Sequence, residues 1–268
     1  MGGMGYPARM TRASTIVALL VAATTLSSCG PKRPGPEAWS VDQLYAAAMD
    51  AYRLGRHARA IELFQLFFQR APGDAREPEA RYALGESHFA RGDYLPAAEE
   101  FRRLVTEYPN HPRARAARFG LCRAYVRLSP RPERDPEYTQ AAFEHCRAFA
   151  DAYPDAPEAT QARTLASEMR AKLARKWLLN AEFYARRRLY DAALLYYRKV
   201  VDDFADTSLA PTALRAMVDI YTRLGYNDEA SQARERLLRD YPNSPEAAAL
   251  RAASPPNGHA PGRSGRNL

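Results

Sequence analysis

The sequence lacks the runs of β-branched residues expected of strands, and it lacks every common catalytic signature. There is no HExxH pair, no phosphate-cradling glycine loop, no GxSxG elbow and no dinucleotide fingerprint. The five histidines are dispersed: His57, His88, His111, His145 and His259. These absences argue against an enzyme, against a metal site and against a bound cofactor, so the function is expected to reside in a binding surface.

Alanine, leucine and arginine dominate the composition, and 46% of the 268 residues are hydrophobic, which favours an all-α protein. The formal charge of +8 and the pI near 9.5 raise the question of nucleic acid binding. Most of the cations are arginines beside Glu and Asp along helix faces, which is typical of a solvated surface. We therefore predict no nucleic acid partner, and an anionic membrane surface or an acidic partner is the next interpretation.

The N-terminus resembles a bacterial lipoprotein signal. Arg9 and Arg12 precede an uncharged apolar run, 16–26, that is too short to span a bilayer, and the sequence LSSCG then resembles a lipobox. We expect residues 1–28 to be a signal peptide and Cys29 to carry the lipid, so that the chain is anchored to a membrane without crossing it. An ordinary signal peptide or an incidental cysteine is the alternative.

Residues 29–39 are rich in Pro and Gly and are predicted to form a tether, with the folded body starting near Ser40. In Gram-negative lipoproteins an aspartate after the lipidated cysteine commonly favours retention in the inner membrane. Gly30 carries no such signal, so this resemblance points to the outer membrane, on its periplasmic face.

Residues 79–109 have the pattern of one tetratricopeptide repeat, two helices joined by a tight turn at Gly92. With Gly92 at position 15 of the 34-residue unit, the other residues fall at expected positions. They are Leu84 at 7, Gly85 at 8, Tyr94 at 17, Ala97 at 20, Phe101 at 24 and Pro109 at 32. The small Gly85 is expected to allow close approach of helices, so a bulky residue there should be costly.

The same register predicts five repeats over residues 40–252, which stack into a right-handed superhelix, an α-solenoid of helical hairpins. Ser40 and Gln43 are spaced as a capping box at the first helix. In the third repeat the prolines of 129–132 stop the first helix and predict an enlarged loop. A long helix from about 157 to 184 opens the fourth repeat, and residues 253–268 are expected to be a disordered tail.

Cys122 and Cys146 fall on the two helices of the third repeat. Buried free thiols are the preferred interpretation, because cysteine is among the most buried residue types. A disulfide in an oxidising compartment is the alternative, and a metal site that includes His145 is the least favoured. Whether the two cysteines are bridged stays open on the sequence alone.

Positions 2, 5, 9, 12 and 13 of such repeats line the concave groove. In the first two repeats they give the candidate peptide-binding residues Tyr45, Met49, Tyr52, Tyr82, Glu86 and Phe89. Aromatic rings and a methionine on this side suit the capture of an extended apolar and aromatic peptide. The alternative is that they pack against the N-terminal segment or a neighbouring helix.

The lipobox, the short tether, the YPxxPxA joins between repeats and the opening sequence QLYAAA at 43–48 resemble the BamD family of outer-membrane assembly lipoproteins, also called YfiO or ComL. This resemblance implies a non-enzymatic lipoprotein subunit of the β-barrel assembly machinery. The N-terminal repeats would receive unfolded outer-membrane proteins through their C-terminal strand, and the C-terminal repeats would dock the periplasmic domains of the barrel subunit. The loop at 129–136 and the tail after Ser254 depart from the family pattern.

Two other functions stay open. One is a periplasmic repeat scaffold of the Tol-Pal, cell-division coordination type, although no heptad segment precedes Ser40. The other is a lipoprotein activator of peptidoglycan synthesis, for which no catalytic motif gives support.

Overall fold

The computed structural model describes residues 1–3 and 35–253. The predicted signal peptide from residue 4 onward, Cys29 and the tail after Ala253 lie outside the described residues. Within the described ranges the regular structure is entirely helical, and no helix there is long and apolar enough to cross a membrane. The elements are η1 (Pro36–Ala38), α2 (Val41–Arg53), α3 (His57–Arg70), α4 (Glu77–Arg91), α5 (Tyr94–Glu107), α6 (Pro112–Leu128), α7 (Glu137–Ala152), α8 (Ala159–Arg186), α9 (Tyr190–Asp203), α10 (Ala210–Leu224), α11 (Asn227–Asp240) and α12 (Pro245–Ala253).

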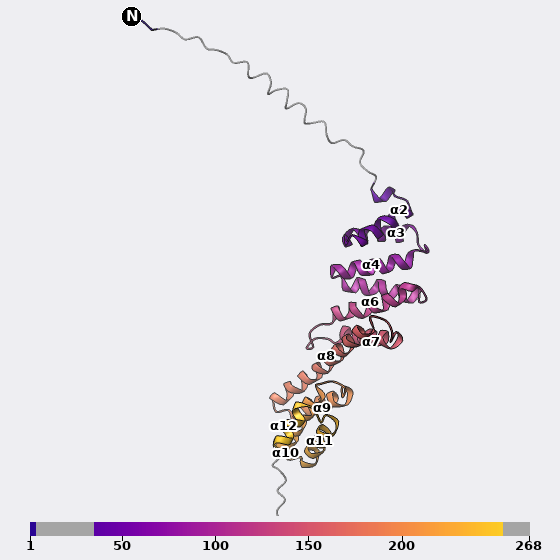
Figure 1. The fold of residues 1–268 in the computed structure, drawn as a ribbon. Helices are drawn as coiled ribbons and strands as arrows, with labels where there is room; N and C mark the ends of the chain where they lie inside the picture. Colours follow the sequence, from indigo (N-terminus) through magenta and orange to yellow (C-terminus); the bar gives the residue numbers. More distant parts are fainter. Residues whose placement is uncertain (4–34, 254–268) are drawn as a thin grey trace, which may run out of the picture.

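The helices form a solenoid of antiparallel hairpins (Figure 1). Each helix packs on its neighbours in sequence, and among the first four hairpins the first helix also contacts the first helix of the next: α2 contacts α4, α4 contacts α6 and α6 contacts α8. The five hairpins run from α2–α3 to α10–α11, and α12 packs on the last one. This confirms the all-α tetratricopeptide-repeat architecture. The long first helix of the fourth repeat is α8, with 28 residues.

Helix starts and turns follow local chemistry. Ser40 and Gln43 form the predicted capping box: Ser40 Oγ accepts a hydrogen bond from the Gln43 amide at 3.2 Å, and Gln43 Oε1 accepts one from the Ser40 amide at 2.9 Å. Gly92 ends α4 in the left-handed conformation, at φ 86°. The corresponding residue of the fourth repeat is Arg188, and it adopts φ 61° without being a glycine.

The core is a stripe of buried aromatic and aliphatic side chains that continues from repeat to repeat. Phe101 of α5 is fully buried, and it lies between Gly85 of α4 and Gly120 of α6. A Cβ atom built on either glycine would lie 2.7 Å from the Phe101 ring, at Cε1 from one side and at Cε2 from the other. The two glycines therefore let one ring join three helices of neighbouring repeats.

The folded body begins before the predicted Ser40. Residues 36–38 form the short helix η1, and Arg70 of α3 donates hydrogen bonds to the backbone carbonyls of Trp39, at 2.8 Å, and of Glu37. The guanidinium of Arg59 lies 5.9 Å from the Trp39 ring centre. The C-terminal end of the expected tether is thus held on α3 by arginines, which its proline and glycine content alone does not indicate.

The third repeat contains a disulfide between Cys122 of α6 and Cys146 of α7. The preference for free thiols was wrong: both cysteines are buried as expected, but their Cα atoms lie 4.6 Å apart on packed antiparallel helices, close enough to bridge. Among the described residues no group of three metal-ligating side chains gathers. The enlarged loop lies against α8, where Lys172 Nζ donates to Ser129 Oγ at 2.8 Å and Lys176 Nζ to the Arg134 carbonyl at 2.7 Å.

Candidate functional site

The predicted groove residues lie on the first helices of the first two repeats. Tyr45, Met49 and Tyr52 belong to α2, and Tyr82, Glu86 and Phe89 belong to α4. Five of the six are partly exposed, whereas Met49 is only 7% exposed and belongs to the core. Because α2 and α4 pack side by side, the partly exposed residues lie on two neighbouring helices. Their role in peptide binding stays a prediction.

Three arginines lie over the aromatic rings of these helices. The guanidinium carbon of Arg76 lies 4.8 Å from the centre of the Tyr45 ring, that of Arg113 lies 4.9 Å from Tyr82, and that of Arg123 lies 4.6 Å from Phe89. Each arginine comes from the first helix of the next repeat: Arg76 is the N-cap residue of α4, and Arg113 and Arg123 belong to α6. These distances are within the range of cation–π contact. We call the surface formed by these three pairs the arginine–aromatic face.

Carboxylates also pair with these arginines. Arg113 donates to both oxygens of Glu79, the shortest contact being 2.6 Å from Nη2 to Oε1. Arg123 forms an ion pair with Glu86. Glu86 was predicted as a groove residue, and in the structure it orients a guanidinium over Phe89. Such paired, planar guanidinium groups stack with less loss of side-chain entropy than lysines would.

Charged groups of the second and third repeats affect the pKa of a tyrosine in the first repeat, so side chains of three repeats lie close together on this face. Burial raises the pKa of Tyr82 to about 12, with a further contribution from Glu86. Burial also raises the pKa of Tyr52, on which the charges of Glu86 and Arg113 act as well. Both hydroxyls therefore stay protonated at neutral pH and are available as hydrogen-bond donors.

The arginine–aromatic face offers ring faces and guanidinium groups in alternation along the first three repeats. Aromatic side chains of a ligand can stack on either group, and the remaining N–H donors can bind backbone carbonyls or a carboxylate. An extended peptide presents these groups at regular intervals. The arrangement is suited to holding an unfolded segment.

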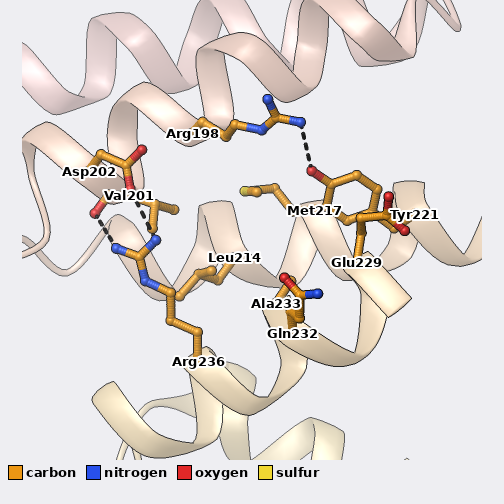
Figure 2. A pocket seen from close by; sticks show the side chains of 10 residues that line it. All are labelled: Arg198, Val201, Asp202, Leu214, Met217, Tyr221, Glu229, Gln232, Ala233 and Arg236. Carbon is orange, nitrogen blue, oxygen red and sulfur yellow. Dashed lines mark hydrogen bonds and ion pairs between the residues drawn. The ribbon is translucent and has the colours of Figure 1, made fainter. Parts of the chain in front are cut away.

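A cavity lies in the last repeats, between α9, α10 and α11 (Figure 2). Its volume is about 240 Å³, and Leu214, Met217 and Val201 contribute apolar atoms to its lining. Two arginines stand at its sides: Arg198 donates to the Tyr221 hydroxyl at 3.0 Å, and Arg236 donates to Asp202 at 3.0 Å. The cavity is large enough to receive one side chain of a partner.

Sequence reasoning found the aromatic residues but missed the arginines that cover them. A usable signal was present: Arg76 follows Tyr45 by 31 residues, and Arg113 follows Tyr82 by the same interval. A recurrence close to one repeat length brings two residues onto neighbouring hairpins. The sequence-based assignment considered each repeat by itself, and so contacts between repeats were overlooked.

Comparison with known proteins gives consistent results. The family model YfiO, described as outer membrane lipoprotein, matches residues 37–237. The chain is 27% identical over 224 residues to the "Outer membrane protein assembly factor BamD" of Caulobacter vibrioides, covering 82% of this chain and 73% of that one. It is 24% identical over 217 residues to the protein of the same name from Neisseria meningitidis serogroup A, covering 77% of this chain and 81% of that one.

Among solved structures, the chain is similar to a tetratricopeptide-repeat protein from Bacteroides fragilis, with a TM-score of 0.43 and 15% identity. The alignment covers 80% of this chain and 96% of that one.

Proposed function

The chain belongs to the YfiO family of outer-membrane lipoproteins, and on this premise we propose that it is an outer-membrane protein assembly factor. In this proposal it is a non-enzymatic scaffold that binds unfolded outer-membrane protein segments and the barrel insertase subunit. The observation that carries the proposal is the family match over residues 37–237, which includes nearly all the helices. Relatives named as assembly factors in several Gram-negative bacteria support it.

We further propose that Cys29 carries a covalent lipid and anchors the chain to the outer membrane, facing the periplasm. The support is the apolar run that ends in LSSCG and the glycine at position 30. A thioether-linked diacylglycerol with an acylated amino terminus supplies enough buried chain length for stable anchoring. Metabolic labelling with palmitate tests this: Cys29→Ser should abolish incorporation, and continued labelling would exclude this cysteine as the site.

Substrate capture is assigned to the arginine–aromatic face. Transmembrane β-strands alternate apolar and polar side chains and carry aromatic residues at both membrane interfaces. Such a strand, while unfolded, offers aromatic rings for stacking on Arg113 or Tyr82, and free backbone groups for hydrogen bonding. Those contacts need no particular sequence beyond this alternation, as a general assembly factor requires.

Peptide binding tests the assignment. The double variant Tyr45→Ala with Tyr82→Ala should weaken binding of C-terminal peptides of barrel proteins about tenfold, if each ring contributes about 0.7 kcal/mol. Tyr45→Phe with Tyr82→Phe keeps the rings and should bind nearly as well as the wild type. Leu195→Ala, at an exposed position of α9 away from this face, is the remote control. Unchanged affinity of the alanine variant, with unchanged helicity, would remove the assignment.

The partner subunit is assigned to the C-terminal repeats, where the cavity of Figure 2 offers an apolar lining between two oriented arginines. Affinity purification of the chain from detergent-solubilised envelope should recover a large barrel protein with periplasmic repeats. Recovery of Pal, or of cell-wall synthases, in its place would favour the Tol-Pal or the peptidoglycan scaffold and contradict the proposal.

A further inference from the structure

The turn between α8 and α9 departs from the other turns of the solenoid. Gly55, Gly92 and Gly225 adopt the left-handed conformation in the corresponding turns, at φ 68°, 86° and 75°. The fourth repeat has Arg188 at this place, at φ 61°, and it is the one described non-glycine residue with positive φ. An L-residue with a side chain is strained in this region, so the arginine is retained at a cost in stability.

Arg188 is one of four neighbouring arginines without an acidic partner. Arg186, Arg187 and Arg188 are consecutive and exposed, and Arg223 is exposed at the end of α10. None of the four forms an ion pair with a described carboxylate, whereas Arg113 and Arg123 of α6 both do. The guanidinium of Arg187 lies 3.8 Å from the centre of the Phe183 ring, which orients it without neutralising its charge.

Large apolar side chains are exposed among these arginines. Leu189 is 52% exposed, Tyr226 is 49% exposed and Phe183 is 39% exposed. Arg188, Leu189 and Tyr226 line the same concavity, of about 480 Å³. Phe183 lines an adjoining one with Arg186, and Arg186 in turn lines a third with Arg188 and Arg223, so these side chains form one continuous surface. We call this surface the basic edge; it comprises Phe183, Arg186, Arg187, Arg188, Leu189, Arg223 and Tyr226.

The acidic groups nearby do not cancel this charge. Asp191 and Asp219 line the concavities that Arg188 also lines. Asp219 is paired with Arg215 at 3.2 Å, and Asp191 is the other carboxylate that lines these two concavities, against Arg186, Arg188 and Arg223. Glu133 lines a further concavity beside Arg186 and Phe183, where Lys176 offsets its charge. The basic edge keeps a net positive charge around exposed apolar groups.

We propose that the basic edge is a membrane contact that binds the surface of a bilayer containing anionic phospholipid. Each unpaired arginine strengthens binding to such a surface about fivefold, and exposed leucine and aromatic side chains enter the interface beside the headgroups. An acidic protein surface is less suited, because a specific partner would fix each guanidinium with a placed carboxylate, whereas fluid headgroups adapt to a consecutive run. The edge lies on repeats four and five, far along the solenoid from α2 (Figure 1).

This contact would orient the molecule. A lipid at Cys29 tethers the N-terminal end, and a second contact in repeats four and five lays the solenoid along the membrane, with its binding surfaces at a fixed height. The inference does not depend on the assembly function, since a scaffold of any kind anchored at one end can use it. Its failure would leave the proposed function in place.

Vesicle flotation tests the proposal with the chain from residue 29 onward, which retains every described helix, and with Cys29→Ser to remove the lipid. The wild type should float with vesicles of phosphatidylcholine containing 30% phosphatidylglycerol, should not float with phosphatidylcholine alone, and should be released by high salt. Arg187→Gln with Arg223→Gln should weaken binding about thirtyfold. The charge-matched control is Arg147→Gln with Arg239→Gln, two exposed arginines elsewhere that pair with Asp151 and Asp240.

Arg188→Gly separates binding from folding. It should weaken vesicle binding about fivefold while the melting temperature stays the same or rises, because glycine relieves the left-handed strain. The proposal is overturned if the wild type ignores anionic vesicles, if the control pair weakens binding as much as the edge pair, or if Arg188→Gly binds like the wild type. Loss of an acidic protein partner in the edge variants, without any vesicle binding by the wild type, would assign the edge to that protein.

Discussion

The close approach of Gly85, Phe101 and Gly120 predicts a coupled response to small substitutions. A Cβ atom at Gly85 would meet Phe101 Cε1 at 2.7 Å, and one at Gly120 would meet Cε2 at 2.7 Å, against an ordinary contact of about 3.5–4.0 Å. Overpacking of this kind costs about 1–3 kcal/mol, and the gain in helix propensity from glycine to alanine returns about 0.5–1 kcal/mol. Each single alanine variant should therefore lose about 0.5–2 kcal/mol.

The two substitutions act on opposite edges of one ring, so the ring has no direction in which to retreat when both are present. Gly85→Ala with Gly120→Ala should cost more than the sum of the single variants. Phe101→Leu removes the ring edges that the added methyl groups meet. In that background Gly85→Ala and Gly120→Ala should be neutral or stabilising, although Phe101→Leu is itself destabilising.

Urea unfolding followed by far-UV circular dichroism measures these differences in all combinations of the three substitutions. Because repeat arrays can lose strict two-state behaviour, midpoints and slopes are compared together. An alanine that stabilises the wild-type background, or one whose cost is unchanged by Phe101→Leu, would refute the assignment of the two glycines to this ring.

Three further predictions follow from the core and its buried charges. Reduction of the Cys122–Cys146 disulfide, or Cys122→Ser with Cys146→Ser, should lower the free energy of unfolding by about 3 kcal/mol, because the closed loop spans 24 residues. Equal urea midpoints with and without reductant would contradict this prediction. Arg81→Met should cost about 3–5 kcal/mol, since it leaves the buried Glu77 and the partly buried Glu100 without their partner. Adding Glu77→Gln should recover part of the loss, and thermal melts that show no cost for Arg81→Met would exclude this account. Desolvation lowers the pKa of His145, so the folded state binds fewer protons than the unfolded state as the pH falls. The free energy of unfolding should therefore be constant with respect to this group above about pH 6.5 and should decrease as the pH falls below that value. His145→Phe should flatten the decrease, and an unchanged pH profile of this variant would refute the prediction.

The repeats were predictable because a tetratricopeptide unit carries its own local signals. Gly92, Ala97 and Phe101 are set by a turn and by the packing of two adjacent helices, so their spacing within one unit is sufficient to identify the hairpin. The capping box at Ser40 is equally local, and it was confirmed. The helix bounds follow from the same signals, to within a few residues.

The contacts that the sequence did not reveal join residues that lie far apart along the chain, on different helices or on a helix and an irregular segment. The Cys122–Cys146 bridge depends on two side chains facing each other across the packed helices α6 and α7, and burial alone favoured free thiols. Arg70 holds the end of the expected tether through two backbone carbonyls, a contact that leaves no pattern in the sequence. All six predicted groove residues lie on the expected helices, but Met49 packs into the core, because its position lies on the buried side of α2.

Depletion of the chain in its host bacterium tests the central claim most directly. If the chain is an assembly factor, depletion should lower the amount of folded outer-membrane barrel proteins, measured as the heat-modifiable fraction on gels, while periplasmic soluble proteins stay constant. Wild-type chain should restore the folded fraction, and Tyr45→Ala with Tyr82→Ala should restore it only in part. Normal levels of folded barrel proteins after full depletion would contradict the account.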